Sequence, residues 1–283
     1  FSKDCGKDGT PSDVMKSLQR FTGKAFSLHY ILLLAAAPLP KSVFDQFVAQ
    51  LESFLFFFII TKTPAKELER NFFNWAKKIR EITGISDSEE QTQKLNEFVN
   101  KYFKNDMEKK KDDLDHALKN LTTDSIQNYR MKHLLMRLTQ HVEISFQGNK
   151  EISLEQFNSL QIEHILPNNP KDDLLVEWGN NNPEISYDDS KIRLGNLTLL
   201  ESSLNKIAGN NFYNDKVNEY KNSTNYLTKS LVVLADSGKT GSIININEKL
   251  ASYKKWDAEH IEDRQSKLIN LIYEIWKISE IKA

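Results

Sequence analysis

Apolar residues at helical spacing dominate the first half of the chain. Over residues 42–61 they recur every three or four positions until Pro64. The members of this stripe are Phe44, Phe47, Val48, Leu51, Phe54, Leu55 and Phe58. Residues 65–83 repeat the pattern, and Gly84 suits the position just after a helix. Further helices are expected within 24–37, from Ser88, and after a cap at Thr123 or Asp124.

The pattern changes near residues 148–150. Short β-type runs follow at 160–166 and 197–200, and the segment 168–191 between them carries Pro and Gly signals of a loop. Helix is expected again from Ser202, over 211–221, and in the amphipathic stretch 257–278. The sequence therefore predicts a mainly α protein with a small β component. We expect a helical domain over 1–150, and over 151–283 a second domain in which two strands are framed by helices.

Composition narrows the class of protein. Hydrophobic residues make up 39% and charged residues 27% of the chain, as in ordinary soluble domains, and the ten Gly and seven Pro are few enough to favour helix. The one cysteine, Cys5, excludes an intramolecular disulfide and a multi-cysteine zinc site, and it suits the cytoplasm. The longest apolar runs, 30–37 and 54–60, are shorter than the roughly 20 residues that cross a bilayer, so no membrane partner is expected. The chain lacks a starting methionine, which suggests a fragment of a longer protein.

The charge balance bears on any interaction with nucleic acid. The chain has a formal net charge of −1, and residues 154–222 hold six Lys or Arg against eleven Asp or Glu. Such an acidic region binds phosphate poorly unless a metal or another domain supplies positive charge.

The end of the first β-type run carries the strongest candidate chemistry. Glu163 and His164 are adjacent there, Asn196 directly precedes the second run, and Asn205 lies nine residues further on, where a helix should begin. A neutral histidine can take a proton from water near pH 7, and a divalent metal can neutralise charge on a phosphodiester. The oxygens of Glu163 and Asn205 suit Mg²⁺ or Mn²⁺. In a regular strand Glu163 and His164 would point to opposite faces, so the strand is expected to end or twist here, before Pro167.

Each of these residues also has an ordinary structural interpretation. Asn196 could be a turn residue after Gly195, Asn205 could only cap a helix, and Glu163 could face solvent. Three basic residues are candidate phosphate contacts or plain surface charges: Arg193, Lys206 and Lys216.

A family resemblance rests on several motifs in one order. They are Glu-His-Ile-Leu-Pro from Glu163, Arg-Leu-Gly-Asn-Leu-Thr-Leu-Leu-Glu from Arg193, Asn-Lys-x-x-Gly-Asn from Asn205, the series Phe212, Lys216, Tyr220 and Ser223, and the later series Trp256, Ile261, Arg264, Leu268 and Trp276. Together they resemble the C-terminal nuclease domain of GmrSD-type restriction proteins, which contains the ββα-metal, or HNH, motif. The resemblance covers residues 155–278, and the helical first half is similar to the region preceding that domain.

The resemblance implies a metal-dependent DNA endonuclease or nickase with Mg²⁺ or Mn²⁺ as cofactor. His164 would be the general base, Glu163 and Asn205 the metal ligands, and Asn196 the residue that braces the loop holding the histidine. The third motif residue is asparagine, a known variant that keeps an oxygen ligand. The family implies bacterial defence against foreign or modified DNA, with a preceding nucleotide-dependent sensing domain that this chain lacks. The rival interpretation is a catalytically silent module that binds DNA or assembles a defence complex.

Overall fold

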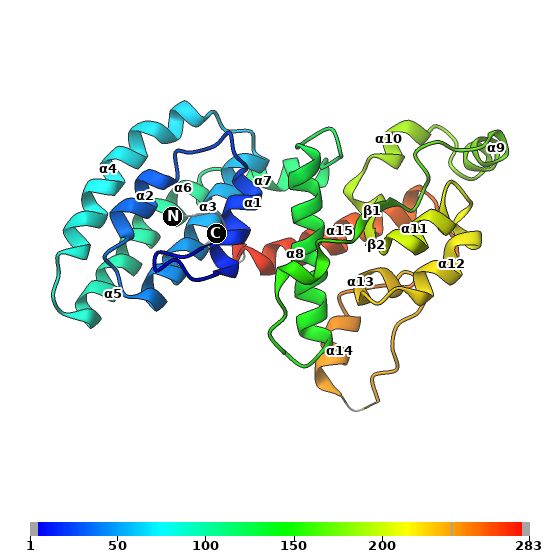
Figure 1. The fold of residues 1–283 in the computed structure, drawn as a ribbon. Helices are drawn as coiled ribbons and strands as arrows, with labels where there is room; N and C mark the ends of the chain where they lie inside the picture. Colours follow the sequence, from blue (N-terminus) through cyan, green and yellow to red (C-terminus); the bar gives the residue numbers. More distant parts are fainter. Residues whose placement is uncertain (1–4, 239, 279–283) are drawn as a thin grey trace. The chain divides into compact units, whose positions relative to one another are not determined.

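The computed structural model describes residues 5–238 and 240–278, and the chain forms two compact units (Figure 1). The first comprises Phe1–Leu118 and Trp276–Ala283, and the second comprises Lys119–Ile275. The protein is mainly helical with one two-stranded antiparallel sheet among the described residues, as the sequence predicts. The units divide at Leu118, however, so the helix Asn128–Phe146 belongs to the second unit, whereas the expected boundary at residue 150 placed it in the first.

The first unit is built entirely from helices in its described part. They are α1 (Asp13–Thr22), α2 (Tyr30–Ala36), α3 (Lys41–Ile60), α4 (Ala65–Thr83), α5 (Ser88–Phe98), the π-helical turn η1 (Val99–Lys104), α6 (Asn105–Glu108) and α7 (Lys111–Lys119), the last of which ends at the division between the units. The expected helices over 42–61 and 65–83 are confirmed to within a residue at each end. The start at Ser88 is also confirmed, since the side chain of Asp87 caps α5 by accepting a hydrogen bond from the Glu90 amide at 2.8 Å.

The core of the first unit forms around α3. Phe54 is fully buried and stacks on Phe103 with ring centroids 4.7 Å apart, while Trp75 packs edge-on at 5.4 Å. By length and composition alone α3 could cross a membrane, the one such helix among the described residues, but 67% of its apolar window is buried inside the protein. Its aromatic residues are core residues, as expected.

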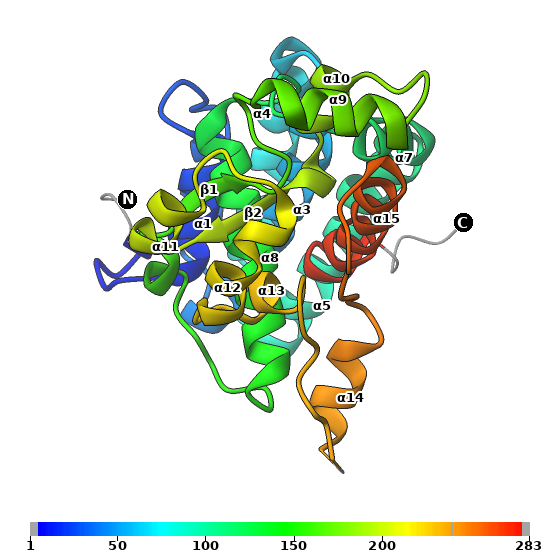
Figure 2. The same cartoon turned by 90° about the vertical axis from the view of Figure 1, so that its right-hand side faces the viewer.

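The second unit places two short strands among helices (Figure 2). Its elements are α8 (Asn128–Phe146), the 3₁₀ turn η2 (Leu154–Phe157), β1 (Gln161–His164), α9 (Asp172–Asn181), α10 (Tyr187–Lys191), the 3₁₀ turn η3 (Leu194–Asn196), β2 (Leu197–Leu200), α11 (Ser202–Ala208), α12 (Tyr213–Asn222), α13 (Tyr226–Lys229), α14 (Gly241–Asn247) and α15 (Ala258–Ile275).

Two local expectations for this unit are wrong. The segment 168–191 is not a loop, because α9 and α10 lie within it: α9 buries Leu174 and Trp178, and the side chain of Ser186 caps α10. The helix α8 begins at Asn128 rather than after Thr123 or Asp124. Thr122 and Ser125 instead form a turn in which the Ser125 hydroxyl accepts a hydrogen bond from the Thr122 amide at 3.0 Å.

The sheet sets the register of the candidate residues. Strands β1 and β2 are antiparallel, with Glu163 opposite Thr198 and His164 opposite Leu197. All four residues of β2 are buried, with α8 and α13 packed against the strand. The helix α11 follows β2 directly and also contacts β1. Because β1 pairs with β2 and α11 contacts β1, the motif that ends β1 lies near the motif that precedes β2 and near the helix that follows it.

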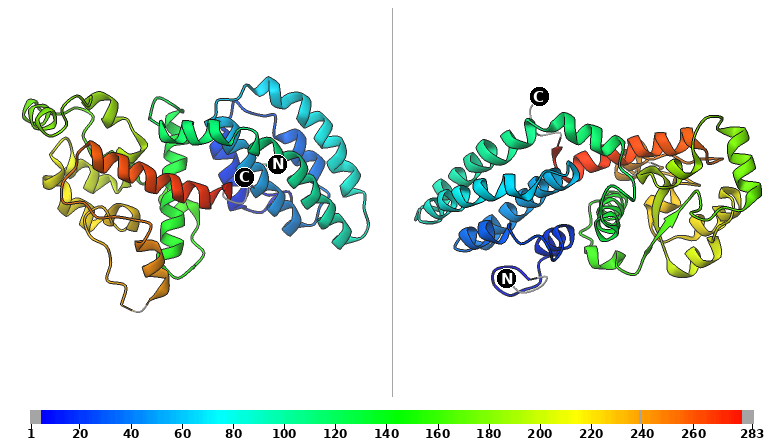
Figure 3. Two further views of the ribbon diagram at one scale, coloured as in Figure 1. Left: turned by 180° about the vertical axis from the view of Figure 1, so that it is seen from behind. Right: turned by 90° about the horizontal axis from the view of Figure 1, so that it is seen from above.

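The long helix α15, red in Figure 3, packs against the 3₁₀ turn η3 that leads into β2. Gly195 lies so close to this helix that a Cβ atom there would meet the Ile261 carbonyl oxygen at 2.1 Å. Gln265 accepts a hydrogen bond from the Gly195 amide at 2.6 Å, and Arg264 donates to the carbonyls of Gly195 and Leu197 at 2.7 and 2.6 Å. Only glycine permits this close approach.

A buried histidine makes the stability of the first unit sensitive to acid. His29 is 1% exposed, its ring lies 4.3 Å from that of Tyr30, and neither ring nitrogen has a hydrogen-bond partner in the described part of the chain. Burial lowers the pKa of His29 to about 4. The folded protein therefore binds fewer protons than the unfolded chain between that pH and the ordinary histidine pKa, so its stability falls as the pH drops through this window.

We expect wild-type protein to lose about 2 kcal/mol more unfolding free energy between pH 7 and pH 5 than His29→Phe does. The aromatic replacement keeps the ring packing and removes the titration. Urea unfolding of both proteins at the two pH values, followed by circular dichroism, measures the difference. Equal losses in the two proteins would contradict this account.

Candidate functional site

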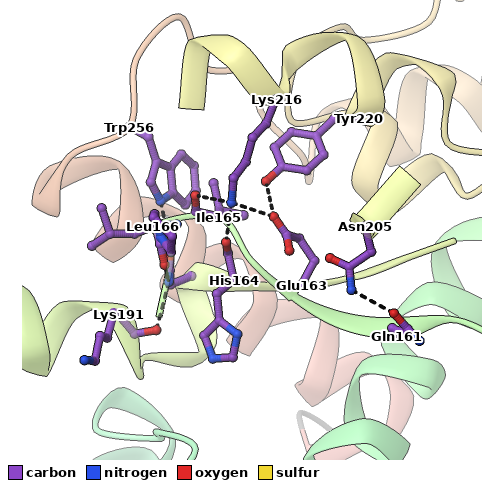
Figure 4. A network of polar contacts seen from close by, with 12 residues as sticks. Gln161, Glu163, His164, Ile165, Leu166, Lys191, Asn205, Lys216, Tyr220 and Trp256 are labelled. Carbon is purple, nitrogen blue, oxygen red and sulfur yellow. Dashed lines mark hydrogen bonds and ion pairs between the residues drawn. The ribbon is translucent and has the colours of Figure 1, made fainter. Parts of the chain in front are cut away.

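Glu163 is held inside the second unit by two donors. Its side chain is nearly fully buried, and its Oε1 atom accepts hydrogen bonds from Lys216 Nζ and from the Tyr220 hydroxyl, both at 2.8 Å (Figure 4). Its Oε2 atom has no partner among the described residues. The interpretation in which Glu163 faces solvent is therefore wrong, and one oxygen of this carboxylate is left for another ligand.

Lys216 is the most unusual side chain of the site. It is fully buried, and its ammonium donates to Glu163 Oε1 at 2.8 Å, to the His164 carbonyl at 2.8 Å and to the Ile165 carbonyl at 3.3 Å. Burial lowers the pKa of Lys216, and the neighbouring Glu163 opposes this shift. The three acceptors match the three N–H donors of a protonated ammonium. The expectation that Lys216 contacts DNA phosphate is wrong, because no part of the side chain reaches the surface.

Tyr220 lies one helical turn after Lys216 on α12 and completes the environment of Glu163. Burial, followed by the charge of Glu163, raises the pKa of Tyr220 well above 10. The hydroxyl therefore stays protonated at any physiological pH, and it acts as a donor to the carboxylate.

His164 points away from this buried group, as Figure 4 shows. Its ring is partly exposed, and neither nitrogen is paired with another described residue. Burial, followed by the positive charges of Lys216 and Lys191, lowers the pKa of His164 to about 4. The imidazole is therefore neutral near pH 7 and has a lone pair that can accept a proton. The strand ends at His164, as the sequence predicts, but its pairing with β2 is regular up to that residue, so the Glu163 and His164 side chains point to opposite sides instead of converging.

Asn196 braces the segment that follows His164. It is fully buried; its Oδ1 accepts from the Leu166 amide at 2.7 Å and from Trp256 Nε1 at 2.9 Å. Its Nδ2 donates to the carbonyls of Leu166 and Lys191 at 2.9 and 2.8 Å. Both donors and both acceptor positions of the amide are used, so this side chain is more than a turn residue, and it touches no solvent.

Asn205 is not a helix cap, because α11 begins after Glu201 and Asn205 is the fourth residue of the helix. Its Nδ2 donates to Gln161 Oε1 at 3.1 Å, which orients the amide. The Oδ1 atom has no partner among the described residues, and Figure 4 shows it on the side of the amide that faces Glu163.

Two oxygens of the site are thus free to bind a cation. Glu163 Oε2 and Asn205 Oδ1 are hard donors of the kind that Mg²⁺ and Mn²⁺ prefer, and few protein ligands leave positions for water and substrate. Within residues 5–238 and 240–278, no group of three or more His, Cys, Asp and Glu side chains could hold a metal. A divalent ion at this place would therefore have Glu163 Oε2 and Asn205 Oδ1 as its protein ligands, both of them oxygens of the kind that Mg²⁺ and Mn²⁺ accept.

The remaining two basic candidates differ from each other. Arg193 donates to Glu262 at 2.5 Å and to the Lys119 carbonyl at 3.0 Å, so its guanidinium serves the packing of the second unit. Lys206 is exposed on α11, the helix that carries Asn205, and pairs with no described residue. Lys206 is therefore the one of the three candidates still available to a phosphate.

Three residues that shape the site are not assigned to it by the sequence. Lys191 influences the His164 ring through its charge, and Tyr220 and Trp256 bind Glu163 and Asn196. Tyr220 and Trp256 belong to the series that resemble the restriction family, and this spacing was the one available signal. Lys191 carried no signal, because it lay in a segment interpreted as a loop.

The comparison with family models agrees with the motifs. The model described as "GmrSD restriction endonucleases, C-terminal domain" matches residues 108–271, more than half of the chain. The protein belongs to this family. The GmrSD C-terminal domain is a domain of restriction endonucleases, so membership implies a nuclease of a restriction system with DNA as substrate. The match contains β1, β2, α11 and α12 in full. No curated protein matches the chain.

The two asparagines of this GmrSD domain should differ sharply in their contribution to stability. We expect Asn196→Ala to lower the unfolding free energy by about 3 kcal/mol, because it removes three buried hydrogen bonds and one part-buried one and leaves their partners unpaired. The matched variant Asn205→Ala loses one exposed hydrogen bond and should cost less than about 1 kcal/mol. Urea unfolding of the two variants measures both values, and a similar cost for both would show that Asn196 is not a brace.

Proposed function

We propose that this protein is a metal-dependent DNA endonuclease or nickase of the HNH type. The observation that carries the proposal is that Glu163 Oε2 and Asn205 Oδ1, on neighbouring elements, have no partner among the described residues. The neutral, unpaired His164 follows Glu163 directly at the end of β1, with its ring turned away from the carboxylate. Glu163 and Asn205 would hold Mg²⁺ or Mn²⁺, and His164 would be the general base. The arrangement of β1, β2 and α11 supports this proposal because strand, strand and helix follow in the order of the ββα-metal motif.

In the proposed hydrolysis, different residues of the chain have different roles. His164 takes a proton from a water molecule while the water oxygen forms a bond to phosphorus. The bond from phosphorus to the leaving oxygen breaks, and that oxygen keeps the electron pair and takes a proton from solvent. A bound divalent ion would neutralise charge on the phosphate oxygens. Asn196 takes no proton; it fixes the backbone that follows His164, and Lys206 would hold a neighbouring phosphate.

The biological role that fits this activity is bacterial defence in the cytoplasm. We infer that the protein is the effector part of an anti-phage, modification-dependent restriction system and cuts foreign or modified DNA. A nucleotide-dependent sensing domain in the full-length protein would supply recognition. The second candidate, a catalytically silent DNA-binding or assembly module, is favoured by the six basic against eleven acidic residues over 154–222.

Substitution of the proposed base should abolish cleavage without unfolding the protein. We expect His164→Ala to slow metal-dependent nicking of supercoiled plasmid by about 100-fold or more, the usual contribution of a general base. Asn205→Ala should also cut poorly, and EDTA should stop the wild-type reaction.

The matched control is His141→Ala, which alters another partly exposed histidine of the same unit, one that pairs with Glu274 and not with the site. It should cut like wild type. If His164→Ala and Asn205→Ala both cut as fast as wild type with Mg²⁺ or Mn²⁺, the proposed site is wrong. Wild-type protein that binds modified and unmodified plasmid but cuts neither would favour the silent module.

Lys206 should contribute to DNA affinity through charge alone. We expect Lys206→Ala to weaken binding of all DNA sequences alike, and to reduce the slope of log affinity against log salt concentration by about 1. Fluorescence anisotropy at several salt concentrations measures the slope. Lys150→Ala, at another exposed lysine of the unit, is the control. An unchanged slope for Lys206→Ala would remove Lys206 from the DNA interface.

A further inference from the structure

Two side chains of α12 donate hydrogen bonds to the same oxygen of Glu163. Lys216 and Tyr220 are four residues apart and therefore lie on one face of the helix. Their Nζ and hydroxyl groups both lie 2.8 Å from Oε1 of Glu163, and all three side chains are buried. We call Lys216 and Tyr220 the α12 clamp.

The α12 clamp acts on one oxygen and leaves the other untouched. A carboxylate that accepts two hydrogen bonds at Oε1 keeps a fixed rotation about its terminal bond, because turning it would break both. Oε2 is thereby left on the side where Figure 4 shows Asn205. The clamped carboxylate can therefore offer a cation only one oxygen.

Lys216 also acts on the neighbouring residue. Its remaining donors reach the carbonyls of His164 and Ile165, so one ammonium fixes both the Glu163 side chain and the backbone that carries the His164 ring. A buried ion pair is weak evidence for a role in stability alone. Well-packed apolar residues often replace a buried ion pair without loss of stability.

We propose that Lys216 and Tyr220 are positioning residues of the nuclease site, which hold Glu163 as a single-oxygen ligand for the divalent ion. This inference rests on the proposed function. It assigns Lys216 and Tyr220 to the support of the metal ligand and the base, with no contact to DNA.

The sharpest test compares two tyrosines of the same helix. Tyr220→Phe and Tyr213→Phe each remove one buried hydroxyl from α12 and change no charge, but Tyr213 donates to the Leu231 and Tyr253 carbonyls and not to Glu163. We expect Tyr220→Phe to bind Mn²⁺ about 10-fold more weakly, in line with the usual effect of residues that orient metal ligands. Tyr213→Phe should bind Mn²⁺ like wild type. Electron paramagnetic resonance of free Mn²⁺, titrated with the full chain, measures both constants.

Variants of Lys216 test the other half of the clamp. Lys216→Met removes the ammonium that fixes Glu163 and should weaken Mn²⁺ binding even though it also removes a neighbouring positive charge, while Lys216→Arg keeps a donor and should bind more tightly than Lys216→Met. Because Lys216→Met also leaves Glu163 buried without its counter-charge, circular dichroism must show that the variant is folded. If Lys216→Met is unfolded, the comparison of Tyr220→Phe with Tyr213→Phe decides whether the α12 clamp supports metal binding.

The possible outcomes distinguish a failure of the α12 clamp from a failure of the proposed function. If Glu163→Gln loses Mn²⁺ binding but Tyr220→Phe binds as well as Tyr213→Phe, the clamp is overturned and the proposed nuclease stands. If wild-type protein binds no Mn²⁺, or if neither Glu163→Gln nor Asn205→Ala weakens binding, the metal site is overturned and the clamp with it.

Discussion

The buried ammonium of Lys216 is the interaction on which the candidate site depends. Removing an ammonium from water costs several kcal/mol, and this cost is offset only when every donor finds an acceptor. Here the three acceptors are a carboxylate oxygen and the backbone carbonyls of His164, the last residue of β1, and of Ile165, which follows it. The position of α12 therefore determines where Glu163 points and where the backbone of His164 lies.

A second set of buried polar contacts holds the same segment from the other side. Asn196 bonds both polar backbone groups of Leu166, and α15 reaches Gly195 at a distance that no side chain would allow. These contacts matter because an isolated pair of four-residue strands has little stability of its own. The small sheet is held by the helices and the asparagine around it, and the contacts that fix the backbone at and after His164 come from residues distant in sequence.

The parts of the fold that the sequence predicts are those that local spacing determines. The helices α3 and α4 follow from apolar residues at helical intervals, and both strands follow from short apolar runs, so their bounds are close to the expected ones. The helices α9 and α10 escaped prediction because Asn, Asp and Pro signals outweighed the spacing of Leu174 and Trp178. Contacts between residues far apart in the sequence leave no local pattern, so the sequence does not predict them. Lys216 resembles a surface lysine until its partner 53 residues earlier is known.

The excess of acidic residues over 154–222 has a structural cause that a count of charges does not show. Six of the eleven acidic residues over 154–222 lie in the first turns of helices, where negative charge stabilises the helix: Glu155, Asp172, Asp173, Asp188, Asp189 and Asp215. The acidic balance thus reflects how many short helices begin in this region. At the site itself the balance is different, because Lys216 neutralises Glu163. A divalent ion beside that carboxylate would bring its positive charge to a phosphate with little cancellation, since its one acidic ligand is already paired. An acidic region can therefore still contain a site suited to a phosphodiester.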